Sequence, residues 1–380
     1  MEHMILKASE NRSMRSSRHV SMGAYDHPSI NVRNAIREEI GDAKFCILVD
    51  EARDESKREQ MAIILRFVDK NSFIKEHFFH VVHVRDTTAL TLNKEICAVL
   101  SCYNLHIENI RGQGYDGASN MRGEWNGLQS LFLKECPYAY YVHCMAHRLQ
   151  LALVTASREV KVVHQFFDHL TNIINIVVGS SKRNDELQYA QGEQIENMIA
   201  FNEIETERGA NQIVAIDFQL QELNSRFCEL TGDLLTLSSA LNPKDAFRSF
   251  KIGDICNLAE NYYPQDFTEQ EICLLMHQLQ HYELDVTKHP DFQNMGTISE
   301  LCRGLEISGK SKFYHLIDRL IRLVLTLPVS TATTERAFSA MKLLKTRLCN
   351  RLEDEHLADN MIVYIEKEIA GNFHHGNDYG

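Results

Sequence analysis

Three carboxylates lie where the ends of strands or helices would expose them to solvent. Asp50 ends the apolar run KFCILVD, Asp116 ends a later strand-like run, and Glu335 falls in the first turn of a distant helical pattern. Brought together, they could bind a pair of Mg²⁺ or Mn²⁺ ions, which would activate water or a 3′-hydroxyl for in-line phosphoryl transfer. An acid after a strand is more often a solvated turn residue, so residue types alone leave both interpretations open.

A second candidate for chemistry is Cys144-x-x-His147. The spacing could supply half of a zinc site, but no partner pair at finger spacing lies nearby. The alternative is a core thiol beside a hydrogen-bonded histidine. The ten cysteines are scattered with no CxxC pair, which favours reduced thiols over a disulfide framework.

Aromatic and histidine side chains give weaker signals. Trp125 is the only tryptophan and could stack on a nucleic-acid base, but a single large aromatic in a helical pattern is more often a core residue. His143 and the His80/His83 pair are expected to be strand positions without a metal.

The elements that would position these residues are those of an α/β protein. Apolar and β-branched runs predict strands, and apolar residues at helical spacing predict helices between them. Strands are expected at 44–50, 61–69, 74–84, 110–116 and 139–147, and helices at 90–105 (with Thr91 as a cap), 121–136 (ended by Pro137) and 147–160. This order predicts a mixed sheet that begins as an antiparallel meander.

The C-terminal part of the chain predicts three amphipathic helices. The first has apolar residues from Phe313 to Leu325 and is closed by Pro328, and the second has Ser330 and Thr331 as caps. The third covers 357–369, with Gly371 as its stop. Such broad apolar faces could pair with a second copy or bury against the chain's own core. The candidates for dimerisation are Phe338, Met341, Leu344, Leu348, Leu357, Met361 and Ile365.

Several of these segments resemble the hAT superfamily of DNA transposases, and most closely plant zinc-finger MYM-type or TTF-type hAT-like proteins. The resemblance lies in ILVDEARDES, GQGYDGASNMRGEWNGL, YYVHCMAHRLQLAL and LPVSTATTERAFSAMKLLKTRL. It implies an RNase H-like core interrupted by a helical insertion, with a DDE triad at Asp50, Asp116 and Glu335. It also implies that His147 lies near the scissile phosphate.

The resemblance divides the chain into segments. It implies a disordered or weakly ordered lead-in (1–32), the N-terminal part of an RNase H-like core (33–190), a remnant of the helical insertion (191–299), a C-terminal dimerisation region (300–370) and a tail (371–380).

Two departures from the family bear on function. Residues 1–45 hold no cysteine for an N-terminal zinc-binding DNA-recognition domain, and around 209–227 part of the insertion is expected to be missing. Because metal-ion catalysis tolerates little misplacement of its ligands, we expect a domesticated or decayed protein that acts through dimerisation, with itself or related hAT-like proteins. The alternative is an active DDE transposase or nuclease that uses Mg²⁺ or Mn²⁺.

Charge narrows the possible partners further. The 380 residues carry 40 Lys and Arg against 52 Asp and Glu, a net charge of −12 that argues against binding DNA by charge alone. A metal-independent nucleic-acid-binding module would depend on the basic arm at Arg12, Arg15 and Arg18. No apolar run is long enough for a membrane span. A nuclear location is implied by the resemblance alone.

Overall fold

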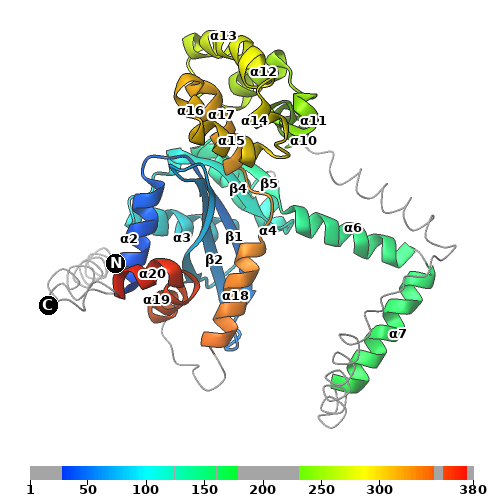
Figure 1. Cartoon of the computed structure of the whole chain (residues 1–380). Helices are drawn as coiled ribbons and strands as arrows, with labels where there is room; N and C mark the ends of the chain where they lie inside the picture. The colour runs from blue at the N-terminus through cyan, green and yellow to red at the C-terminus, as the bar shows by residue number, and fades with distance from the viewer. Residues whose placement is uncertain (1–27, 124, 160, 179–230, 346–353, 375–380) are drawn as a thin grey trace, which may run out of the picture.

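The computed structural model describes residues 28–123, 125–159, 161–178, 231–345 and 354–374. Residues 1–27 of the predicted lead-in, the stretch 209–227 and Leu348 lie outside these residues. Residues 28–32 of the predicted lead-in are helical, because α2 (Pro28–Ile40) begins there and buries Val32. At the centre is one five-stranded sheet with helices around it and a separate cluster of helices at one end (Figure 1). The α/β fold class predicted from the sequence is confirmed.

The sheet has the strand order β3-β2-β1-β4-β5. Strands β1 (Phe45–Arg53), β2 (Glu59–Val68) and β3 (Ile74–His83) form the expected antiparallel meander. Strands β4 (Ile110–Tyr115) and β5 (Tyr140–His143) pair in parallel on the other side of β1. Strand β1 is buried from Phe45 to Val49, as its unbroken apolar run predicts for a central strand.

The pleat of β4 separates the two faces of the sheet. Gln113 donates from Nε2 to the carbonyls of Gln129 and Ala139, on the side of α5 (Leu128–Glu135). The neighbouring residues Gly112 and Gly114 face the opposite side, where Pro328 crosses the sheet. A Cβ added to Gly112 would lie 2.8 Å from Pro328 Cδ, so these strand glycines admit the chain that leads to the C-terminal helices.

Helices α2 (Pro28–Ile40), α3 (Ala89–Cys102) and α5 contribute to the core of the sheet. The same core receives α18 (Ala332–Leu344), α19 (Asp354–Ile365) and α20 (Lys367–His374). Short elements connect the strands on the α3 side: η2 (Ile107–Asn109) and α4 (Ser119–Arg122).

A second core belongs to the helices that follow the sheet in sequence. They are α10 (Thr231–Ser238), η3 (Ser239–Leu241), α11 (Lys244–Phe247), α12 (Ile252–Tyr262), α13 (Glu269–Asp285), α14 (Pro290–Gln293), α15 (Ile298–Ile307), α16 (Lys310–Phe313) and α17 (His315–Thr326). We call this group the helical unit. Residues of α15 and α17, and Leu327, belong to the core of the helical unit. The chain therefore passes from this core to the core of the sheet after Leu327, and not near residue 300.

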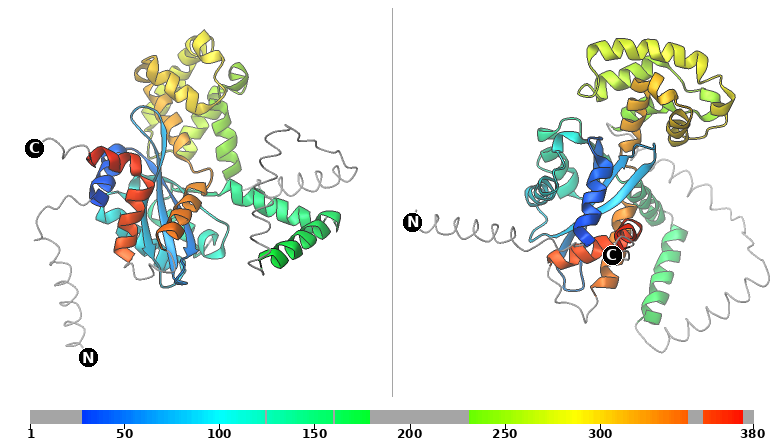
Figure 2. Two further views of the ribbon diagram at one scale, coloured as in Figure 1. Left: turned by 60° about the horizontal axis from the view of Figure 1, so that its bottom comes forward. Right: turned by 60° about the vertical axis from the view of Figure 1, so that its left-hand side comes forward.

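Two helices lie outside both cores. Helices α6 (Met145–Glu159) and α7 (Lys161–Val178) extend away from the sheet, as two further views confirm (Figure 2). Among the described residues, no helix has the length and apolarity that crossing a bilayer requires.

Several predicted boundaries are wrong in detail. The cap of α3 is Thr88, whose hydroxyl accepts the Thr91 amide. The segment 121–136 breaks between α4 and α5 at a loop where Gly127 donates to the Gly123 carbonyl. The predicted strand 139–147 ends at His143 because α6 begins at Met145.

The C-terminal helices also differ from their predicted limits. Phe313 ends the short helix α16 and is 78% exposed, so it does not belong to the apolar face of α17. The third predicted helix is divided at Glu366 into α19 and α20, and Gly371 lies inside α20 rather than ending it.

Candidate functional site

The parallel pairing of β1 with β4 brings two of the predicted acids to one edge of the sheet. Leu48 pairs with Gly114, so Asp50 and Asp116 lie two residues further along the paired segments. Asp116 directly follows β4, but Asp50 does not end its strand as predicted, because β1 continues to Arg53 along β2. In a parallel α/β sheet this edge is where ligand sites are commonly built. The edge therefore carries the sequence-predicted Asp50 and Asp116 side by side.

The Asp50 carboxylate is half-buried and held by α18. Oδ1 accepts the amide of Glu51 at 2.9 Å, and Oδ2 lies 3.2 Å from the hydroxyl of Thr334. The pKa of Asp50 is raised to about 6, chiefly by burial, with smaller contributions from the charges of Asp116 and Glu335, while hydrogen bonds from the Glu51 amide and the Thr334 hydroxyl oppose the rise. Asp50, Asp116 and Glu335 thus interact electrostatically at one place, although they come from distant parts of the chain.

The three side chains do not form a ligand set for a metal ion. Asp116 Oδ1 accepts the Ala118 amide at 3.1 Å in a local turn, and Glu335 is exposed to solvent on α18. In the described part of the chain, no three His, Cys, Asp or Glu side chains are close enough to hold a metal. As placed, the residues therefore do not fit the Mg²⁺ or Mn²⁺ pair that the carboxylates predicted.

The segment between α17 and α18 positions Thr334 and Glu335. Val329 accepts the amide of Met145, and the amide and hydroxyl of Thr331 donate to Cys144 Sγ, each at 3.3 Å. These bonds tie the segment to the start of α6, beside the carboxyl end of β5. Cys144 is therefore a buried thiol that accepts hydrogen bonds, in agreement with the core-thiol alternative to a zinc ligand.

A cavity of about 330 Å³ opens beside Asp116. Its lining includes Arg122, His143, His147 and Arg148, from α4, β5 and the first turn of α6. The rings of His143 and His147 have centroids 5.5 Å apart. A Cβ on Gly117 would lie 2.7 Å from the His143 ring, so this glycine permits the ring to approach the turn after β4. The structure thus places His147 and Asp116 in the lining of one cavity, and places His143 in a strand.

Sequence reasoning did not identify Glu51, Arg122, Arg148 or Thr334 as members of this site. Burial raises the pKa of Glu51 to about 7, with smaller contributions from Glu59, Asp116 and Asp50. No spacing rule selects a second acid directly after Asp50. Arg122 reaches the cavity from α4 and Arg148 from the first turn of α6, and no local pattern brings these two arginines together.

Trp125 is not a core residue, contrary to the commoner expectation for its pattern. It is 83% exposed, in the loop that joins α4 to α5. A Cβ on Gly127 would lie 2.3 Å from the Gly123 backbone nitrogen, so the close approach of the loop ends requires glycine.

The residues predicted for dimerisation are largely used within the chain. Phe338, Met341, Leu357 and Met361 are buried in the core of the sheet. Leu344 and Ile365 are partly buried against the same core. The large apolar side chains that these helices leave exposed are Leu343, Tyr364 and Phe373. The apolar stripes seen in the sequence therefore attach the helices to the chain's own sheet.

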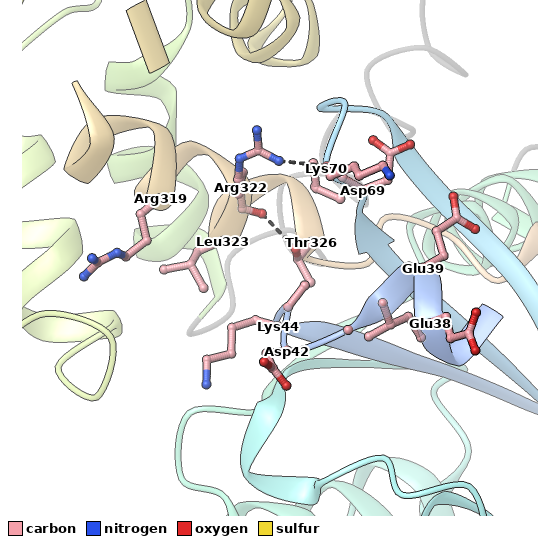
Figure 3. Close-up of a pocket in the computed structure, with 14 residues that line it drawn as sticks. Glu38, Glu39, Asp42, Lys44, Asp69, Lys70, Arg319, Arg322, Leu323 and Thr326 are labelled. Atoms are coloured by element: carbon pink, nitrogen blue, oxygen red, sulfur yellow. Dashed lines mark hydrogen bonds between the residues drawn. The ribbon is translucent and has the colours of Figure 1, made fainter. Parts of the chain in front are cut away.

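A second cavity, of about 480 Å³, lies where the helical unit meets the sheet (Figure 3). Arg322 donates to the Asp69 carbonyl at 2.8 Å across this junction, and Arg319 donates to Glu271 within the helical unit. Burial and the nearby Arg111 lower the pKa of Lys44. The lining contains both acidic and basic side chains, so it has no excess of positive charge that would favour an anion. The cavity is therefore a junction between the two units rather than an anion site.

Two family models match the chain. The ZMYM1/FAM200, RNase-like domain matches residues 1–127, and the hAT family C-terminal dimerisation region matches residues 304–369. A curated human protein, the "52 kDa repressor of the inhibitor of the protein kinase", is 24% identical over 175 residues. That match covers 41% of this chain and 23% of the human protein. A MYM-type zinc finger is not shown by these matches. Over these two regions the chain is similar to the ZMYM1/FAM200 RNase-like domain and to the hAT dimerisation region, and this similarity supports a hAT-like, transposase-like protein.

Proposed function

We propose that this hAT transposase-like protein acts through self-association by its C-terminal helices and is domesticated, without transposase catalysis. The match of residues 304–369 to the hAT dimerisation region carries the proposal. Related hAT-like proteins would bind through the same helices, and a nuclear location belongs to the same proposal. The placement of Asp50, Asp116 and Glu335 without a common ligand geometry supports loss of catalysis.

Sedimentation velocity of the full chain tests self-association. The full chain is required because α18 and α19 bury their apolar faces against the sheet. We expect a dimer at tens of micromolar, the range in which modest interfaces associate. A chain that sediments only as a monomer throughout that range would refute the proposal.

One observation favours a second candidate function, DNA strand cleavage. The charges of Asp116 and Glu335 both act on Asp50, so the acids of the predicted triad share one edge of the sheet. The carboxylates would have to move to bind one cation together. Cleavage of nicked or hairpin DNA in Mn²⁺, lost in Asp116→Asn and kept in the exposed control Asp42→Asn, would establish this candidate. No cleavage by the wild-type chain would reject it.

A further inference from the structure

The cavity beside Asp116 has no part in the proposed self-association. We call it the arginine cavity, because Arg122 and Arg148 line it together with Asp116, His143 and His147. With both histidines neutral, its lining has two positive charges against one negative charge, in a chain whose net charge is −12. A concave site with an excess of one charge concentrates ligands of the opposite charge. The arginine cavity therefore favours an anion.

The two other cavities of the described residues have no such excess. The cavity between the sheet and the helical unit is lined by four acids (Glu38, Glu39, Asp42, Asp69) and four bases (Lys44, Lys70, Arg319, Arg322). A groove of about 970 Å³ beside α18, α20 and β3 is lined by four acids (Glu39, Glu76, Glu366, Glu368) and three bases (Lys75, Arg336, Lys367). Among these three cavities, only the arginine cavity has more bases than acids.

Packing fixes the walls of the arginine cavity. The Tyr141 hydroxyl donates to the Asp116 carbonyl at 2.9 Å, which ties the turn after β4 to β5. The His143 ring is stacked on Tyr141 with centroids 6.3 Å apart, and Gly117 leaves room for it. His143 and Arg148 are only 5% and 3% exposed, so the surrounding side chains set their positions. A site held in this way loses little conformational freedom when a ligand binds.

The start of α6 adds to the positive potential of the cavity. His147, Arg148 and Leu151 line it from the N-terminal end of this 15-residue helix. The N-terminus of a helix carries a partial positive charge and favours anions. Arg122 comes from α4, so guanidinium groups from two separate elements line one cavity. A guanidinium group binds phosphate through paired hydrogen bonds, which makes phosphate the anion that fits this lining best.

Charge and access favour a terminal phosphate over a phosphate within a nucleic-acid chain. A phosphate monoester carries a charge of about −1.5 to −2 at pH 7, which matches two arginines, whereas a backbone phosphate carries a single charge. Arg148 is almost completely buried, so only a group that enters the cavity can reach it. A terminal phosphate can enter end-on, whereas a backbone phosphate has a sugar on each side. The cavity volume of about 330 Å³ is at the small end of ligand sites.

We propose that the arginine cavity binds the terminal phosphate of a phosphate monoester, with Arg122 and Arg148 as its donors. The monoester is a free nucleotide or the 5′-phosphorylated end of a nucleic acid, since both present the same group. Asp116 is the one like charge in the lining, and it weakens the binding without preventing it. The inference goes beyond the proposed self-association and needs neither a metal ion nor strand cleavage.

Isothermal titration calorimetry of the full chain with adenosine 5′-monophosphate, at constant ionic strength, tests the binding. We expect a dissociation constant at or below about 1 mM, and binding at least about tenfold weaker in Arg122→Gln and Arg148→Gln. The control is Arg248→Gln, which removes the same charge at an exposed position of the helical unit and should retain the wild-type constant. Circular dichroism would verify folding of Arg148→Gln, and Arg122→Gln changes an exposed residue, so it keeps the test decisive.

Asp116→Asn separates phosphate binding from DNA cleavage. Removing the like charge should strengthen the binding of adenosine 5′-monophosphate about two- to fivefold. The second candidate function predicts that the same variant loses cleavage, so the two can fail independently. Weaker nucleotide binding in Asp116→Asn would overturn the placement of the phosphate beside this carboxylate.

Oligonucleotides with and without a 5′-phosphate distinguish the sources of the group. Tighter binding of the 5′-phosphorylated strand than of adenosine 5′-monophosphate would support a nucleic-acid end, and the reverse order would support a free nucleotide. Equal binding of the phosphorylated and unphosphorylated strands would show recognition of the backbone and overturn the proposal. So would no binding of either phosphate monoester, or equal binding by the wild type and both arginine variants. None of these outcomes changes the sedimentation test of self-association.

Discussion

At the scale of single residues, Asp50 carries an unfavourable charge in the folded protein. Its pKa is raised to about 6, first by burial. Between about pH 4 and pH 6 the folded state keeps a proton that the unfolded chain has lost, so stability falls as pH rises through this window. We expect Asp50→Asn to increase the free energy of unfolding by about 1 to 3 kcal/mol at pH 7.5, measured by urea denaturation.

The same experiment at lower pH provides the internal check. Near pH 4 the carboxyl is protonated in the folded protein and becomes protonated in the unfolded chain, so the gain from Asp50→Asn should vanish. Asp42→Asn is the control, because Asp42 is exposed and its substitution should change stability by less than about 0.5 kcal/mol. A variant no more stable than wild type at pH 7.5 would contradict the assigned environment of Asp50.

At the scale of elements, one buried ion pair joins α18 to the turn between β1 and β2. Lys345 Nζ lies 2.6 Å from Asp54 Oδ2, and each side chain is only 1% exposed. Gln60 donates to the same carboxylate oxygen at 3.0 Å. Lys345→Ala would leave the Asp54 charge buried without its cation, so we expect a loss of about 3 to 5 kcal/mol in chemical denaturation.

The pH dependence of that loss tests its cause. Burial alone would raise the pKa of Asp54, but hydrogen bonds from Lys345, the Arg58 amide and Gln60 hold it below its ordinary value. The stabilisation from this carboxylate is therefore present at neutral pH and lost as pH falls below about 4. Lys342→Ala, at an exposed position on the same helix, should be nearly neutral. Equal effects of the two substitutions would contradict this role.

At the scale of the whole molecule, a second buried ion pair couples the sheet to the helical unit. Arg111 of β4 donates to both carboxylate oxygens of Asp266, at 2.6 and 2.9 Å, and the side chains are 2% and 5% exposed. Asp266→Ala would leave the guanidinium buried without its acid. We expect a loss of about 3 to 5 kcal/mol, and faster amide exchange in α12 and α13 than in β1.

The control for this coupling is Asp254→Ala. Asp254 pairs with Lys251 at 3.6 Å on the surface of α12, where such pairs contribute little, so exchange rates in both units should stay at wild-type values. If Asp266→Ala speeds amide exchange equally in the sheet and in the helical unit, the two units unfold together. The ion pair would then stabilise the whole fold rather than the contact between the units.

The sequence determined the parts of this protein that depend on local patterns. The apolar run ending at Asp50 predicted β1, and the antiparallel meander and the later strand ending near Asp116 followed from alternation and turn residues. The motifs around Asp116 and Glu335 also selected a family that the matched regions support. Boundaries failed where a tertiary contact ended an element, as at Met145, whose amide bonds Val329.

The tertiary structure alone decided which surfaces remain available. Hydrophobic spacing showed that α18 and α19 have apolar stripes, but it could not tell whether the sheet or a second copy covers them. The sheet covers Met341 and Met361, and Tyr364 stays exposed. The sequence likewise shows the three acids. Only the packing of the chain brings Asp50, Asp116 and Glu335 to one edge of the sheet, where they interact but are not placed as ligands of one metal ion. Burial and distance are properties of contacts between remote segments, and no local pattern encodes them.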